Sequence, residues 1–254
     1  MTASAGADPR QHARDRPDGD GPPWTGTHVL VVPGLGLLAY LRPLVRSLER
    51  RGVRASVLDL PGHRKGGAGA TQPTVAAVAC ATAEALLARP ASERVVVLGH
   101  STGAQAALRA ALLVQDTRPL AAVVMAGPTV APTQRRLDLL ALAAGGAYRH
   151  DSPRELVVLP EVLRARLRLL SMVRSAMADR PERHVATLTA PLLLTAGRSD
   201  TFAPSWWLDL LASGATRSPS VAVARLPGSH NNPFTHPDDI ARVVTSMVGR
   251  VALR

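Results

Sequence analysis

One stretch of the chain constrains the fold more than any other. Residues 94–103 read Arg-Val-Val-Val-Leu-Gly-His-Ser-Thr-Gly, and an alanine- and leucine-rich run follows. The apolar residues predict a buried strand and the continuation predicts a helix. Ser101 would lie on a tight, strained turn between them, where Gly99 and Gly103 let neighbouring backbone pass close by. Such a turn presents a serine hydroxyl at the edge of a sheet. Ser101 is therefore a candidate nucleophile, the alternative being an ordinary turn serine.

Apolar strands alternate with helical segments along most of the chain. The predicted strands cover residues 27–32, 55–60, 95–98, 120–126, 191–197 and 220–226, and predicted helices cover 40–51, 74–88 and about 237–251. Strands that are apolar throughout and separated by helices indicate a parallel sheet covered on both faces. We expect an α/β fold with a mostly parallel sheet of about six or more strands.

The alternation stops between residues 129 and 187. This segment has no strand candidate, and its apolar residues recur at helical spacing between prolines and a Gly-Gly pair. It predicts a helical insertion between two parts of an α/β core, residues 25–128 and 188–254. Residues 1–24 are polar and rich in Pro and Gly, which predicts a disordered leader.

Composition narrows the class of protein. The formal net charge is +11, but the arginines that carry it are spread along the chain and only 3% of residues are aromatic. This pattern does not favour nucleic-acid binding. The leader has no apolar run long enough for a signal peptide or a membrane span. We expect a cytoplasmic protein with neither nucleic acid nor membrane as a partner. We expect the side chain of the single cysteine, Cys80, to be small, apolar and buried.

Two later segments supply the groups that a serine nucleophile needs. Asp200 follows the predicted strand 191–197 in the run Gly-Arg-Ser-Asp-Thr-Phe-Ala-Pro, and His230 follows the strand 220–226 in Pro-Gly-Ser-His. Parallel strands place their carboxyl ends side by side, so both residues can converge on Ser101. The other histidines and carboxylates weighed for these roles have weaker contexts: His63, His100, His236, Asp59, Asp238 and Asp239.

The chain from residue 25 to its end resembles the α/β-hydrolase superfamily. The Gly-His-Ser-Thr-Gly turn, the Gly-x-x-Asp-x-x-x-Pro loop and the Gly-Ser-His loop occur in the superfamily's order of Ser, Asp and His. The resemblance implies that Ser101 is the nucleophile and that His230 acts first as general base and then as general acid. It also implies that Asp200 holds the imidazole tautomer. No cofactor and no metal are implied.

Attack on a carbonyl also requires donors for the oxyanion. The resemblance assigns one to the backbone amide of Thr102 and the other to the backbone amide of Leu35, in the loop Pro33-Gly-Leu-Gly. Here the chain departs from the superfamily, because Pro33-Gly34 replaces a common His-Gly pair. The loop also fails as a dinucleotide-binding fingerprint, since its third glycine is missing.

By the same resemblance, the helical segment 129–187 would be a cap whose apolar faces select the substrate. Trp206 and Trp207 follow Asp200 closely, and we expect them either to line the pocket or to pack beneath the following helix. Arg135, Arg136, Arg164 and Arg168 are candidates for holding an acidic substrate, or else form a solvated helix face.

These features favour a cofactor-free serine hydrolase, monomeric or homodimeric. It would cleave a small or medium carboxylic ester, lactone or thioester through an acyl-enzyme. A serine rather than an aspartate in the turn argues against the superfamily's haloalkane dehalogenases and epoxide hydrolases. Three alternatives remain open: a carbon–carbon bond hydrolase of the meta-cleavage-product type, a non-catalytic ligand sensor, and a release or cyclisation enzyme.

Overall fold

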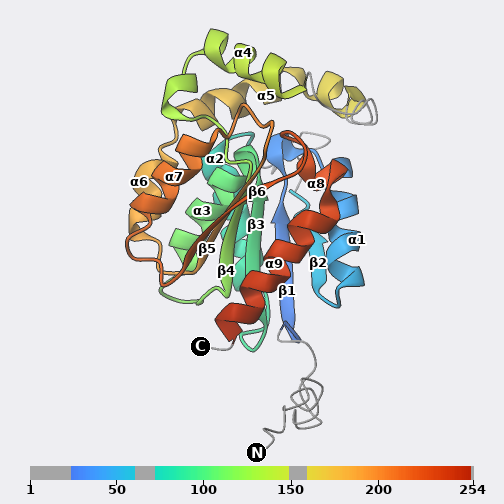
Figure 1. The fold of residues 1–254 in the computed structure, drawn as a ribbon, viewed down its shortest axis with the longest axis vertical. Coiled ribbons are helices and arrows are strands. Elements are labelled where there is room, and N and C mark those ends of the chain that lie inside the picture. Colours follow the sequence, from blue (N-terminus) through green and yellow to red (C-terminus); the bar gives the residue numbers. More distant parts are fainter. Residues whose placement is uncertain (1–23, 61–71, 149–158, 253–254) are drawn as a thin grey trace, which may run out of the picture.

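A six-stranded parallel sheet forms the centre of the protein (Figure 1). The computed structural model describes residues 24–60, 72–148 and 159–252. The strand order is β2-β1-β3-β4-β5-β6, and every neighbouring pair is parallel. The expected α/β class and sheet size are confirmed. The strands are β1 (Thr27–Val32), β2 (Arg54–Val57), β3 (Arg94–His100), β4 (Ala122–Ala126), β5 (Leu192–Gly197) and β6 (Val221–Leu226).

Helices cover both faces of the sheet (Figure 1). Successive side chains of a strand point to opposite faces, so Leu30 and Val32 join one buried cluster while Val29 and Val31 join the other. Burial on both sides explains why the central strands are apolar throughout. On one face lie α2 (Val75–Leu87), α3 (Thr102–Val114) and α7 (Ser205–Gly214), and on the other α1 (Arg42–Arg50) and α9 (Pro237–Ala252).

Between β4 and β5, the secondary-structure elements formed by the described residues are all helices, joined by loops. The two long ones, α4 (Leu137–Tyr148) and α5 (Leu159–Ala178), lie beyond the end of the sheet at which the strands finish (Figure 1). Residues 149–158, which join them, lie outside the described residues. Short helical elements complete the chain: η2 (Gly34–Gly36), η3 (Ala39–Leu41), η4 (Pro132–Gln134), α6 (Pro181–His184), η6 (Val185–Thr187) and α8 (Asn232–Thr235).

Side-chain hydrogen bonds attach α5 to the helices beneath it. The Val75 backbone N–H at the start of α2 donates to Ser175 Oγ at 2.9 Å. The buried Gln105 of α3 donates from Nε2 to the Ala176 carbonyl at 3.2 Å. These bonds satisfy polar groups that would otherwise be buried without partners, and they fix α5 over one end of the sheet.

The structure differs from two local expectations. The strand predicted over 55–60 is shorter and ends at Val57. Cys80 is exposed rather than buried, because α2 presents the residues around Val75, Ala79 and Leu86 to the core and Cys80 falls on the opposite face. Residues 1–23 of the expected leader and the turn that contains His63 lie outside the described residues.

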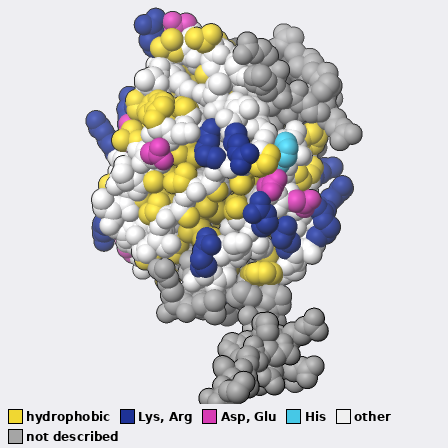
Figure 2. All heavy atoms as spheres, viewed as in Figure 1, with side chains coloured by type: hydrophobic (Ala, Val, Ile, Leu, Met, Phe, Trp, Pro, Cys, Tyr) yellow, Lys and Arg dark blue, Asp and Glu magenta, His cyan; other side chains and the backbone are white. Residues whose placement is uncertain are grey.

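On the face seen in Figure 2, basic side chains lie among neutral, apolar and acidic ones. This distribution agrees with arginines that are spread along the sequence. Within the described part of the chain, no helix combines the length and the apolar character needed to span a membrane.

Candidate active site

Ser101 occupies a strained turn between β3 and α3. Its backbone has φ 58° and ψ −127°, a conformation that non-glycine residues rarely adopt. The turn depends on two glycines, because a Cβ on Gly99 would lie 2.1 Å from the Gly103 carbonyl oxygen and a Cβ on Gly103 would lie 2.4 Å from that of Val32. The expected tight turn is therefore present, and it places the Ser101 side chain at the carboxyl end of the sheet.

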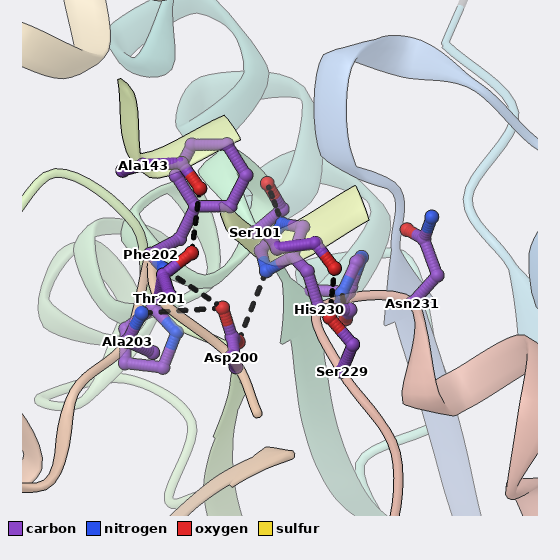
Figure 3. Close-up of polar contacts among 12 residues, drawn as sticks. Ser101, Ala143, Asp200, Thr201, Phe202, Ala203, Ser229, His230 and Asn231 are labelled. Atoms are coloured by element: carbon purple, nitrogen blue, oxygen red, sulfur yellow. Dashed lines mark hydrogen bonds and ion pairs between the residues drawn. The ribbon is translucent and has the colours of Figure 1, made fainter. Parts of the chain in front are cut away.

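The structure brings Ser101, His230 and Asp200 together in one buried chain of hydrogen bonds (Figure 3). His230 Nε2 lies 3.0 Å from Ser101 Oγ, and His230 Nδ1 lies 3.0 Å from Asp200 Oδ2. An ionised carboxylate can only accept, so Nδ1 carries the ring hydrogen and Nε2 is free to accept the serine proton. An imidazole held in this way is the arrangement that activates a serine hydroxyl.

The loop that carries Asp200 also donates hydrogen bonds to its carboxylate. Its Oδ1 accepts the backbone N–H groups of Phe202 at 2.9 Å and of Ala203 at 3.3 Å. Burial opposes ionisation of this carboxyl group, but attraction to His230 and the hydrogen bonds from His230 and Phe202 outweigh burial, and its pKa lies below the ordinary value. An ionised Asp200 can stabilise positive charge on His230.

His100, which precedes Ser101, belongs to a second buried chain of hydrogen bonds. Its Nε2–H donates to the His230 carbonyl at 2.9 Å, so Nδ1 must accept, and the Tyr40 hydroxyl donates to it at 2.8 Å. The Tyr40 oxygen in turn accepts the Gly34 N–H at 3.0 Å. Burial, reinforced by the neighbouring His230, lowers the His100 pKa to about 3. A neutral His100 thus links the loop after β1 to the backbone of His230.

The two predicted oxyanion donors lie near Ser101, and one is already engaged. Leu35, at φ 52°, points its backbone N–H at Thr102 Oγ1, 2.9 Å away. The Thr102 N–H, in the first turn of α3, has no acceptor among the described residues. The loop that carries Leu35 approaches Ser101 closely, since a Cβ on Gly34 would lie 2.7 Å from Ser101 Cβ.

An apolar pocket with a volume of about 320 Å³ opens above Ser101. One part, here called the floor, is formed by loops at the carboxyl end of the sheet, and the other, here called the roof, by α4 and α5. Within the described lining His230 is the only titratable side chain. The floor consists of Leu35, Ser101, Thr102, Thr129, Val130, Phe202 and His230, and the roof of Leu137, Leu140, Ala141, Ala144, Val173 and Ala176.

The roof is hydrogen-bonded to both loops that carry the Asp and the His. Thr201 Oγ1, next to Asp200, donates to the Ala143 carbonyl, and Ser229 Oγ, next to His230, donates to the Ala147 carbonyl (Figure 3). A Cβ on Gly146 would lie only 3.0 Å from Thr201 Cγ2, so this glycine allows the close approach. The position of α4 is therefore coupled to the Asp200 and His230 loops.

The structure does not bring Trp206 and Trp207 to the pocket lining. Trp207 is fully buried and donates from Nε1 to the Pro128 carbonyl at 3.0 Å, whereas Trp206 is 44% exposed. Neither ring is among the residues that line the pocket, and Trp207 packs in the buried core.

Two of the four arginines proposed for an acidic substrate are paired with carboxylates. Arg135 lies 2.7 Å from Glu182 and Arg136 lies 2.9 Å from Asp138. The side chains of Arg164 and Arg168 lie outside the described ones. In the described part of the chain, no group of three or more His, Cys, Asp or Glu residues is placed to hold a metal ion.

Sequence reasoning did not identify Phe202 and Tyr40 as parts of the site. The Phe202 ring lies 4.6 Å from the His230 ring, centroid to centroid, and lines the floor of the pocket. The chain has only two phenylalanines and two tyrosines, so their scarcity was an available signal. Phe202 follows Asp200 by two positions, and Tyr40 follows the loop after β1.

A family model described as the alpha/beta hydrolase family matches residues 29–243. A search among curated proteins finds no match. The thioesterase RedJ from the prodiginine biosynthetic pathway in Streptomyces coelicolor aligns with a TM-score of 0.63 and 18% identity, covering 96% of this chain and 97% of that chain.

Two further solved structures have the same fold at similarly low identity. A lipase-esterase related protein from Clostridium acetobutylicum gives a TM-score of 0.63 at 14% identity, covering 87% of this chain and 94% of that one. A thermophilic esterase from Thermogutta terrifontis gives a TM-score of 0.62 at 18% identity, covering 89% of this chain and 90% of that one. The family model spans most of the chain and the observed sheet fits it, so the chain belongs to the alpha/beta hydrolase family.

Proposed function

We propose that this protein is a cofactor-free serine hydrolase that cleaves carboxylic esters or thioesters with an apolar acyl group. The observation that carries the proposal is the Ser101–His230–Asp200 chain of hydrogen bonds at the floor of an apolar pocket. A binding protein needs the pocket, but it has no need of an imidazole positioned to take the serine proton.

In the proposed reaction, Ser101 Oγ attacks the carbonyl carbon while its proton moves to His230 Nε2. The carbonyl electron pair moves onto the oxygen, which backbone donors stabilise. When the tetrahedral adduct collapses, the bond to the alcohol or thiol breaks and the leaving group takes the proton from His230. A water molecule then attacks the acyl-enzyme, with His230 again as base, and releases the acid and free Ser101.

The pocket supports an apolar acyl group rather than an acidic substrate. Its lining carries no Lys, Arg, Asp or Glu among the described residues, and Arg135 and Arg136 pair with carboxylates of the protein. The pocket volume of about 320 Å³ is roughly twice that of a ~150 Å³ cavity that binds benzene, which suggests an acyl group of about a dozen non-hydrogen atoms.

The similar structures agree with this proposal and leave the leaving group open. Two are named as esterases or esterase-related and one as a thioesterase. At such identities they share the fold alone, so the choice between ester and thioester rests on assay.

Intact-mass analysis with a fluorophosphonate and stopped-flow assay with p-nitrophenyl octanoate test the proposal. We expect one phosphonyl adduct and a burst of p-nitrophenol from the wild type. Ser101→Ala should show neither, with hydrolysis reduced by about 10⁴-fold or more. Exposed Ser213→Ala, in α7, serves as the matched control and should react like the wild type. A folded wild type that forms no adduct and turns over no acyl ester or thioester would contradict the proposal.

A further inference from the structure

Thr102 presents a hydroxyl group, as well as an amide, to the reacting centre. It follows Ser101 directly, lines the floor of the pocket and is 5% exposed. Its oxygen accepts the Leu35 N–H at 2.9 Å. The bond that would be expected to run from Leu35 to the substrate therefore runs to Thr102 instead.

The proton of this hydroxyl group has no acceptor among the described residues. A threonine hydroxyl donates one hydrogen bond, and buried donors in proteins are almost always paired. The buried hydroxyl groups of Thr27, Thr129 and Thr195 also have no partner among the described residues, whereas those of Thr82 and Thr245 donate to backbone carbonyls of their own helices. Thr102 instead retains a donor beside Ser101, in the pocket that would receive the substrate carbonyl.

We propose that the Thr102 hydroxyl group is an oxyanion donor that takes the place of the Leu35 amide, which holds and polarises it. This inference rests on the proposed function, since it requires attack by Ser101 on a carbonyl. As the carbon–oxygen π bond opens and charge develops on the oxygen, the Thr102 N–H and O–H both donate to it. Because Leu35 N–H donates to Thr102 Oγ1, the hydroxyl becomes a stronger donor than an isolated one.

This assignment gives Leu35 a different part from the one that the resemblance implies. Its amide orients a side-chain donor instead of donating to the oxyanion itself, because its one N–H is engaged with Thr102 Oγ1. Its φ of 52° is uncommon for leucine, and the hydrogen bond to Thr102 is the contact that this backbone conformation secures. The strained residue and the hydroxyl group therefore act as one unit.

Thr102→Val and Thr102→Ser separate the role of the hydroxyl group from that of side-chain shape. Valine keeps the shape and removes the donor, and we expect kcat to fall by about 10²-fold with KM little changed, the usual effect of losing one oxyanion donor. Serine keeps the donor and should restore most of kcat. Thr245→Val, on α9 on the other face of the sheet, removes a buried hydroxyl group that bonds only within its helix and should match the wild type.

An alkyl trifluoromethyl ketone supplies a second readout, because its adduct with serine carries an oxyanion. Its inhibition constant should rise in Thr102→Val by about the same factor as kcat/KM falls. Binding of the corresponding fatty acid, which forms no oxyanion, should be unchanged. A merely structural role of Thr102 would not produce this difference.

The fluorophosphonate reaction distinguishes failure of this inference from failure of the proposed function. Suppose that the wild type forms the adduct, but that kcat of Thr102→Val equals or exceeds the wild-type kcat, or that Thr102→Ser is as slow as Thr102→Val. The hydroxyl group is then not a donor, and the serine hydrolase proposal stands. If the folded wild type forms no adduct and shows no turnover, both proposals fall.

Discussion

The floor and the roof of the pocket are built on different principles. At the floor and directly behind it, buried polar groups are joined in two hydrogen-bonded chains that meet at His230, one through Ser101 and Asp200 and one through His100. The roof contributes leucine, valine and alanine side chains from two helices. The floor specifies distances between atoms, whereas the roof specifies a volume.

This difference indicates where substitutions can be tolerated. A hydrogen bond loses most of its strength over a fraction of an ångström or a poor angle, and the glycines beneath the floor leave no room for a Cβ. An apolar wall accepts other side chains of suitable size. Reaction type should therefore be sensitive to the floor, and the choice of acyl group to the roof.

The largest expected effect comes from Asp200, the carboxylate bonded to His230 of the floor. Asp200→Asn keeps the shape, but its amide favours the wrong imidazole tautomer, and we expect kcat to fall by about 10⁴-fold. Steady-state hydrolysis of p-nitrophenyl octanoate measures this loss. Exposed Asp209→Asn in α7 is the control and should leave kcat unchanged. An Asp200→Asn enzyme within tenfold of the wild type would assign the orienting role elsewhere.

Next in size is the effect of crowding the turn that carries Ser101. A Cβ on Gly99 would lie 2.1 Å from the Gly103 carbonyl oxygen, so Gly99→Ala should lower the free energy of unfolding by about 3 kcal/mol. Gly145→Ala provides the contrast in α4, where a Cβ would meet no atom within 4 Å. It should raise stability by about 0.5 kcal/mol, because alanine favours a helix. Urea denaturation measures the unfolding free energy of both variants. Equal changes in the two variants would contradict the expected difference between the turn and α4.

A smaller and more selective effect is expected from filling the roof. Ala144→Leu places extra carbon atoms in the pocket, and kcat/KM for p-nitrophenyl decanoate should fall by about 10- to 100-fold. The acetate ester should react within about twofold of the wild type, since its acyl group ends before the roof. Leu142→Gln, on the same helix but 74% exposed and outside the lining, is the control. Equal losses for both esters would place the acyl group elsewhere.

The smallest effect concerns pH. Burial lowers the His100 pKa to about 3 in the folded protein, so below about pH 6 the unfolded chain binds a proton that folded His100 does not. The contribution of His100 to the free energy of unfolding is fully present at neutral pH. It should fall by about 1.4 kcal/mol per pH unit as the pH drops from about 6 toward the pKa of His100 in the folded protein. His28, with a pKa lowered to about 4 chiefly by burial, acts in the same direction.

Urea denaturation of the wild type and of His100→Gln between pH 7 and pH 4 measures this dependence. The variant lacks the imidazole, so its unfolding free energy should change less steeply with pH, by about one proton's contribution. Identical slopes would show that His100 is protonated in the folded protein, contrary to the chain of bonds through Tyr40 and His230.

Which residues could be predicted depended on whether their signal was local. Ser101, Asp200 and His230 each sit in a short motif directly after a strand, and the parallel sheet brings strand ends together whatever the loops contain. The bond between Tyr40 and His100 joins residues 60 positions apart and has no motif. Trp206 and Trp207 are near Asp200 in sequence, but the structure does not bring them into the pocket lining, and Trp207 is bonded to the Pro128 carbonyl in the core.

The sequence by itself determined the class of fold, the approximate ranges of most strands and helices, and the positions at which a serine, a carboxylate and an imidazole emerge; the strand order came from the tertiary structure. The features that the sequence determined follow from periodicity and from turns that require glycine, which are properties of neighbouring residues. Only the tertiary structure decided which face of α4 and α5 forms the roof. It also decided that the Leu35 amide donates to Thr102 Oγ1. Both depend on contacts between distant segments, whose geometry is fixed only when the whole core packs.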